Sequence, residues 1–128
     1  MDKQKFIEAY NESRNGTDGF VRHPLVRKFA YSLGVQECAE AGCYWLLDVL
    51  ATELPAEMRK HKDESNRAIV KVHVSDSQGR IVAEIEDDWV IWSKDIEWTD
   101  LPDGEWNFMV SDEGYTESPY RMILLSEY

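Results

Sequence analysis

The strongest pattern along the chain is an alternation of apolar and polar positions that begins at Arg67. Valine occupies every second position of residues 70–74, and a similar alternation runs through residues 81–86. The polar segment Asp76-Ser77-Gln78-Gly79 lies between the two runs and has the composition of a turn. Period-two alternation on both sides of a short turn predicts a β-hairpin.

Further strands are expected between this hairpin and residue 128. The candidate segments are Trp89–Lys94, Trp106–Val110 and Tyr120–Leu125, with a short extended piece at Ile96–Trp98. Polar turn segments such as Pro102-Asp103-Gly104 separate them. Because the connections are short, we expect neighbouring strands to run antiparallel.

The first half of the chain follows a helical period instead. Residues 2–13 predict a short amphipathic helix. Apolar residues spaced three or four apart predict a main helix from Val35 to about Leu54, which Pro55 should stop or restart as a short turn. This helix is the longest apolar element of the first half, so it should cover one face of the sheet.

Together these elements predict an α+β fold. We expect a four- to five-stranded antiparallel β-meander packed against one main helix, with a short N-terminal helix. The 128 residues are the usual size of one domain, with a helical part at about residues 1–60 and the sheet at about 67–126.

Charge adds an asymmetry to this picture. The chain has 25 acidic and 14 basic residues, a formal net charge of -11. The first 65 residues hold 11 acids and 9 bases, whereas the other 63 hold 14 acids and 5 bases. An acidic surface should repel nucleic acid and anionic membrane and favour a basic partner. A role in solubility alone remains the alternative.

Cysteine usage and the absence of an apolar leader indicate a cytoplasmic protein. Cys38 and Cys43 are expected on one helix, where a disulfide between them is disfavoured, so both thiols should be reduced and buried. No segment is long and apolar enough to cross a membrane. No metal-binding cysteine spacing is present.

The sequence contains no familiar catalytic motif, and we expect no cofactor, no metal and no catalytic residue. Asp48 is the one carboxylate inside the apolar part of the main helix, and Arg27, Lys28 or Tyr44 could pair with it. A structural tie is the favoured interpretation. A small enzyme or ligand-binding domain that uses Asp48 and His23 is an alternative.

The acidic residues of the second half form the main candidate site. Glu84 and Glu86 should project from one face of a strand, about 6.6 Å apart, which is near twice the rise of about 3.4 Å per phosphate in one DNA strand. Such a row could imitate part of a phosphate backbone beside exposed tryptophans, although an ordinary solvated face remains the alternative. The candidate partner-binding residues are Glu84, Glu86, Asp87, Asp88, Trp89, Trp92, Asp95, Glu97, Asp103 and Glu105.

Four motifs also carry a family resemblance. They are Arg22-His23, the helix with Tyr44-Trp45-Leu46-Leu47-Asp48, the segment Trp98-Thr99-Asp100-Leu101-Pro102, and the ending Ser126-Glu127-Tyr128. In this order they resemble a family of small uncharacterised proteins of bacterial genomes, plasmids and phage-like elements, over about residues 20–128. The resemblance implies a mobile-element or phage context and no activity. Its usual aspartate-glycine-asparagine turn is replaced here by the more acidic Glu86-Asp87-Asp88-Trp89.

These observations lead to one main functional hypothesis. The chain is expected to be a non-catalytic acidic interaction protein of a phage or mobile element, of the anti-CRISPR or anti-restriction type. It would inhibit a host defence complex by occupying the basic cleft of a nucleic-acid-binding protein, without contacting nucleic acid or membrane itself. A homodimer or larger assembly, paired through the strand Tyr120–Leu125, is a further alternative.

Overall fold

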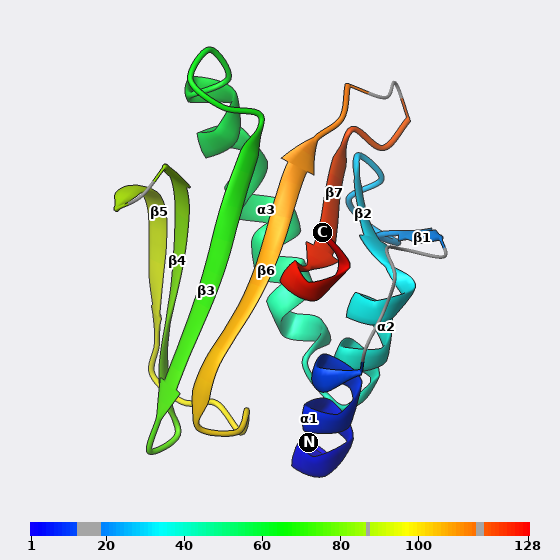
Figure 1. Cartoon of the computed structure of the whole chain (residues 1–128), viewed down its shortest axis with the longest axis vertical. Coiled ribbons are helices and arrows are strands. Elements are labelled where there is room, and N and C mark those ends of the chain that lie inside the picture. Colours follow the sequence, from blue (N-terminus) through cyan, green and yellow to red (C-terminus); the bar gives the residue numbers. More distant parts are fainter. Residues whose placement is uncertain (13–18, 87, 115–116) are drawn as a thin grey trace.

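A seven-stranded mixed sheet organises the described part of the chain. The computed structural model describes residues 1–12, 19–86, 88–114 and 117–128. The strands lie side by side in the order β1-β2-β7-β6-β3-β4-β5 (Figure 1). Their bounds are β1 Phe20–Arg22, β2 Phe29–Ser32, β3 Arg67–Ser75, β4 Gln78–Glu86, β5 Trp89–Ile96, β6 Gly104–Asp112 and β7 Tyr120–Leu124.

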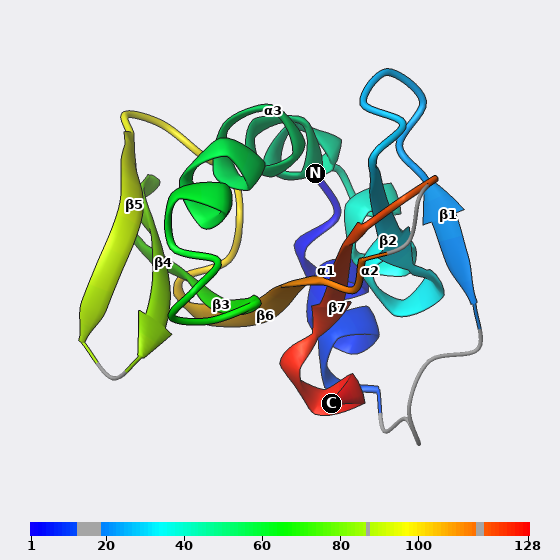
Figure 2. The ribbon, with the colours of Figure 1, turned by 90° about the horizontal axis from the view of Figure 1, so that it is seen from above.

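Three α-helices and a short terminal turn accompany the sheet. Their bounds are α1 Lys3–Asn11, α2 Leu33–Glu40, α3 Tyr44–Lys60 and the 3-10 helix η1 Leu125–Glu127. Seen from above, α3 lies along one side of the sheet, and β4 and β5 rise beside it (Figure 2). We call the face toward α3 the inner face and the opposite one the outer face.

The inner face and α3 form the core because their apolar periods coincide. Cross-strand pairs on the inner face include Val70 with Ala83 and Val70 with Phe108, all fully buried. The buried residues of α3 recur three or four positions apart and belong to the same apolar cluster as the sheet. They are Leu46, Leu47, Leu50, Ala51, Leu54, Pro55 and Met58.

The predicted four- to five-stranded antiparallel meander is wrong. The hairpin of β3 and β4 and its extension to β5 are present, but β6 pairs with β3 rather than with β5. The segment after β5 crosses at the lower end of β4 and β3 and continues as β6 on the other side of β3 (Figure 1). Residues 108–111 of β6 are buried, whereas most of β5 is exposed, so β6 takes the central position and β5 the edge.

The sheet is also mixed rather than antiparallel. Residues 20–32 contribute β1 and β2, and β2 runs parallel to β7, with Phe29 opposite Tyr120. Of these two short strands, the sequence suggested only one, as a short extended piece at Lys28–Ser32 that overlaps β2. All four residues of β2 are buried, so its sequence shows no alternation.

The single main helix predicted from Val35 to Leu54 is wrong as well, because it is divided into α2 and α3. Gly42 stands at the break with φ of +127°, a conformation that side chains rarely adopt. A Cβ at this position would lie 3.0 Å from the Cα of Met1. In contrast, Pro55 lies inside α3, which continues to Lys60.

The N-terminal helix covers a part of β6 that β7 does not reach. The Tyr10 hydroxyl accepts a hydrogen bond from the backbone N–H of Asn107 at 2.9 Å. The rings of Phe6 and Tyr10 pack edge-on against Trp106, with ring centroids 5.1 and 5.0 Å away. The helix α1 thus gives this section of β6 a polar partner and an apolar cover.

A buried carboxylate ties the last turn to the start of α2. Glu127 is 6% exposed, and its Oε1 accepts hydrogen bonds from the Ser32 hydroxyl at 2.6 Å and from the Leu124 backbone N–H at 2.9 Å. The Ser32 oxygen in turn accepts from the Val35 backbone N–H and so caps α2. Within the described residues, no helix is long and apolar enough to span a membrane.

We expect Glu127→Ala to lower the free energy of unfolding by about 2–3 kcal/mol, because it leaves two buried donors without their acceptor. Urea unfolding followed by circular dichroism measures the change. Ser126→Ala, at the exposed neighbouring position, is the control and should stay within about 0.5 kcal/mol of the parent. Equal effects of the two substitutions would contradict the buried tie.

Candidate partner-binding site

Three of the ten predicted site residues lie on the outer face of the sheet and are paired with bases. Glu84 lies 3.2 Å from the Lys71 ammonium, and Asp95 lies 2.9 Å from the Arg80 guanidinium. Glu105 is 3.9 Å from His73 across the β3–β6 pair. Acidic and basic side chains therefore lie next to one another on the outer face.

The ion pairs follow from the strand register. Arg80 of β4 stands opposite Asp95 of β5 and His73 of β3, and His73 stands opposite Glu105 of β6. The hydrogen bond to Glu84, followed by its charge, raises the pKa of Lys71. Arg80 and Asp95 face each other directly, whereas Lys71 and Glu84 are diagonal neighbours. Opposite charges at such positions stabilise one another, so this face does not present a bare row of carboxylates.

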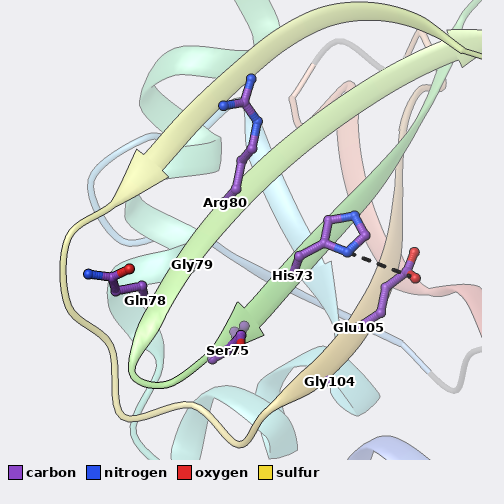
Figure 3. A pocket seen from close by; sticks show the side chains of 8 residues that line it. His73, Ser75, Gln78, Gly79, Arg80, Gly104 and Glu105 are labelled. Atoms are coloured by element: carbon purple, nitrogen blue, oxygen red, sulfur yellow. Dashed lines mark ion pairs between the residues drawn. The ribbon is translucent and has the colours of Figure 1, made fainter.

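A wide depression lies at the end of the β3–β4 hairpin, with a volume of about 480 Å³. His73, Arg80 and Glu105 stand along its strands, and Ser75 and Gln78 lie near the turn (Figure 3). His73 is half exposed and Arg80 is exposed, so the depression is open to solvent. Catalysis at a polar group generally requires a more enclosed site.

A second group of the predicted residues lies at the turn between β4 and β5. Glu86 and Asp88 are exposed and have no ion-pair partner among the described residues. Trp89 is 40% exposed and packs edge-on against His61, at 5.4 Å between ring centroids. Asp87, which the sequence placed in the same cluster, lies outside the described residues.

The remaining predicted residues separate from one another. Glu97 and Asp103 are exposed at the other end of the sheet, in the segment that joins β5 to β6. Trp98 stands beside Glu97 and is 69% exposed. Trp92 instead belongs to the inner side, where it packs against the apolar core. The ten residues therefore do not form one patch.

What connects the unpaired acids is the strand β5. It is the last strand of the sheet, and no described strand pairs with its outer side, which we call the free edge. Glu86 and Asp88 lie at its start and Glu97 lies just past its end. Its own lysine, Lys94, is held 2.9 Å from Glu53 of α3 and is neutralised there.

Sequence reasoning did not single out Val90 as a site residue. It is 46% exposed on β5 between Trp89 and Ile91. The run Trp89-Val90-Ile91-Trp92 is apolar without alternation, which is typical of a strand buried on both faces. When such a run is partly exposed, it forms an apolar edge of the sheet. The run alone does not show that its strand lies at an edge, so the strand order is needed to recognise this site.

Asp48 and His23, the pair in the enzyme alternative, do meet. Asp48 Oδ1 lies 2.7 Å from His23 Nε2, while His23 Nδ1 accepts the backbone N–H groups of Leu25 and Val26 at 3.1 and 3.0 Å. An Nδ1 that accepts two N–H groups has no proton of its own, so Nε2 carries the proton and donates it to Asp48.

This geometry gives His23 a structural role. The ring is 3% exposed and both of its nitrogens are engaged. It holds the turn between β1 and β2 against α3. Within the described residues, Asp48 forms its ion pair with His23 and none with Arg27, Lys28 or Tyr44, the partners predicted for it. The contact ties the turn to the helix and leaves no ring nitrogen free to accept a substrate proton.

Both cysteines are buried and neither forms a disulfide, as predicted, but they do not share a helix. Cys38 lies in α2 and Cys43 precedes α3. Burial, followed by the nearby Cys38 and Asp100, raises the pKa of Cys43 to about 12. Among the described residues, no three His, Cys, Asp or Glu side chains gather in a group that could hold a metal ion.

A family model matches residues 6–128 of the chain. The chain belongs to DUF6876, a family of unknown function. Comparison with curated proteins gave no match, and comparison with solved structures also gave none. Membership of an uncharacterised family, expected from the four motifs, is therefore confirmed.

The four motifs of this DUF6876 chain have structural roles. His23 and Asp48 bond to each other, and Glu127 binds Ser32. Thr99 is buried, its backbone N–H donates to the Ser77 carbonyl at 2.8 Å, and its hydroxyl accepts from the Leu101 N–H. Residues of these four motifs thus take part in contacts that hold the fold together.

We expect His23→Ala to lower the free energy of unfolding by about 3 kcal/mol, because it opens a cavity and orphans two backbone N–H groups. Asp48→Asn should cost less than about 1 kcal/mol, since an amide oxygen still accepts from Nε2 and the side chain is mostly exposed. Urea unfolding measures both. His73→Ala, on the exposed outer face, is the matched control, and an equal loss there would refute the tie.

Cys43 should be almost inert toward alkylation in the folded protein. With a pKa of about 12 its thiolate fraction at pH 8 is about one in ten thousand, against about a quarter for a free thiol. Iodoacetamide labelling followed by mass spectrometry should proceed about a thousandfold more slowly in buffer than in denaturant. A native rate within about tenfold of the denatured rate would show that the thiol is reactive.

Proposed function

We propose that this DUF6876 chain is a non-catalytic binding domain that captures a basic, extended segment of a partner protein along the free edge of β5. The observation that supports this most directly is the exposure of apolar side chains on and beside that strand. Trp89 and Val90 are 40% and 46% exposed, and Trp98 is 69% exposed. Tryptophans that remain partly exposed are the common anchors of protein interfaces.

Backbone pairing would supply affinity. An edge strand presents unpaired N–H and C=O groups, and proteins usually protect such an edge with a free lysine, a bulge or a covering element. Here Lys94 is withdrawn to Glu53, and the register shifts with β4 are confined to its Ala83–Glu86 section. The section Trp92–Ile96 is in regular register and could accept another strand.

Charge selects the kind of partner. Eight residues of β5 extend over about 26 Å, with unpaired carboxylates at both ends. Antiparallel pairing of two copies would bring Asp88 of one chain near Glu97 of the other, and like charges on facing positions are destabilising. A basic strand would meet complementary charge at both ends, so we favour a basic partner over a second copy.

The sequence suggested that two chains pair through the strand Tyr120–Leu125, which requires this strand to lie at an edge of the sheet. Strand β7 lies between β2 and β6 and is paired on both sides. A homo-oligomer would have to use another surface.

In its more specific form, the proposal is that this chain is a phage or mobile-element protein that inhibits a nucleic-acid-binding host complex. It is supported by the net charge of -11 and by the unpaired acids beside β5. The pairing of Glu84, Asp95 and Glu105 with bases moves the proposed contact from the outer face to the edge. Imitation of a phosphate row on that face is therefore not part of the proposal.

The test uses two designed peptides of about ten residues, one alternating Lys with Val and one alternating Glu with Val, a length that matches β5. Titration of the ¹⁵N-labelled chain should shift amide signals along β5 with the lysine peptide only. Raising the salt to about 1 M should weaken binding, because the association depends on charge. Equal binding of the glutamate peptide, or shifts that map elsewhere, would reject the proposal.

Two edge variants and a control complete the test. Trp98→Ala should weaken binding of the lysine peptide at least about tenfold, and Val90→Lys should weaken it by placing a cation on the edge. Leu25→Ala removes an apolar side chain that is 86% exposed far from β5 in sequence, and it should leave binding unchanged. Sedimentation of the free chain as a dimer that Val90→Lys dissociates would instead assign the edge to self-association.

A further inference from the structure

A second, unrelated hollow lies between α3 and the strands β2 and β7. Its volume is about 180 Å³, and it is more enclosed than the depression at the hairpin. One part of its lining is apolar and the other is cationic or hydroxylic. The lining residues are Val26, Lys28, Phe29, Ala51, Thr52, Pro55, Ala56, Arg59 and Tyr120.

Two cations with exposed side chains border this hollow. Lys28 and Arg59 come from segments about thirty residues apart, and both border the same small space. Neither forms an ion pair with a carboxylate among the described residues, although Lys71, Arg80 and Lys94 do. Two cations on the rim of one small hollow attract an anion to it.

Tyr120 adds a directed donor. Its side chain is 4% exposed, and its hydroxyl is hydrogen-bonded to Arg59. A guanidinium can only donate, so the phenol oxygen accepts and its own proton remains available for a second partner. Burial raises the pKa of Tyr120 and Asp112 raises it further, whereas Arg59 acts in the opposite direction. The phenol therefore keeps its proton at neutral pH.

The backbone holds these groups in place. Phe29 and Tyr120 are register partners in the parallel β2–β7 pair, and the Tyr120 N–H donates to the Lys28 carbonyl at 3.1 Å. Arg59 belongs to the last turn of α3. The backbone positions of Lys28, Arg59 and Tyr120 are therefore fixed around the hollow before any ligand arrives, which lowers the cost of binding.

We propose that this hollow binds a small organic monocarboxylate, with the carboxylate held by Arg59, Lys28 and the Tyr120 hydroxyl and the apolar body against Phe29, Ala51 and Pro55. The planar fork of an arginine matches a carboxylate in geometry. The apolar lining favours an acid with a hydrocarbon body over an inorganic anion.

Size restricts the ligand further. A volume of about 180 Å³ is below the range of about 300–1,000 Å³ that drug-sized ligands occupy, and it is the share of about six waters in the liquid. A short branched or single-ring acid fits this space, whereas a nucleotide or a long-chain fatty acid is too large. The site is distinct from the edge of β5, so its failure would not affect the partner-binding proposal.

The probe is benzoate, with benzyl alcohol as its uncharged counterpart and inorganic phosphate as an anion without an apolar body. Titration of the ¹⁵N-labelled chain should give saturable shifts at Lys28, Phe29, Tyr120 and residues 51–59 with benzoate. Neither benzyl alcohol nor phosphate should bind as tightly. Absence of saturation by about 10 mM benzoate, or equal affinity for either comparison compound, would overturn the proposal.

Variants separate specific recognition from general charge. Arg59→Gln should weaken benzoate binding at least about tenfold, and Tyr120→Phe, which keeps the ring, should weaken it about fivefold. Lys60→Gln is the matched control, because Lys60 is the next residue but pairs with Glu57 and does not line the hollow. If Lys60→Gln weakened binding as much as Arg59→Gln, non-specific attraction would explain the result and the site would be rejected.

Discussion

Burial of the inner face of the sheet beneath α3 is the interaction on which the remaining structure depends. Strand β3 places four small or branched residues on that face, and β4, β6 and β7 extend the same layer on either side. Each large apolar side chain that becomes fully buried contributes about 1.5–3 kcal/mol relative to exposure. The strands with the most buried residues are therefore central, and β5, which has little to bury, is left at the edge with its backbone partly unpaired.

Much of this architecture could be read from the sequence, and the errors have physical causes. Alternation identified β3, β4 and β6, because these strands have one buried and one more polar face for at least part of their length. Alternation specifies which face is buried but contains no information on which strand is the neighbour, so the position of β6 beside β3 was missed. The helix break was missed because apolar residues spaced three or four apart continue on both sides of Gly42, whereas its positive φ separates α2 from α3.

The candidate site could be predicted only in part, for a related reason. Acid residues can be counted along a chain, but their neutralisation depends on which bases the register places opposite them. Lys71 and Arg80 were known from the sequence, yet only the pairing of β3, β4 and β5 shows that they neutralise Glu84 and Asp95. His23 and Asp48 were named as a pair that could act together, and their contact is real. Full burial of the imidazole, which no local pattern reveals, makes the contact a structural one.

The position of β7 also has a consequence for the time course of synthesis and folding. Strand β7 fills the place between β2 and β6, and β2 pairs with a segment about 90 residues further along the chain. Until that segment leaves the ribosome, the buried positions of β2 have no neighbour on that side, and β6 lacks its second partner. Because contacts between distant parts of a chain form slowly, the sheet closes last at its centre rather than at its rim. A nascent chain would therefore depend on the hairpin of β3 and β4, whose contacts are local, as its first stable structure.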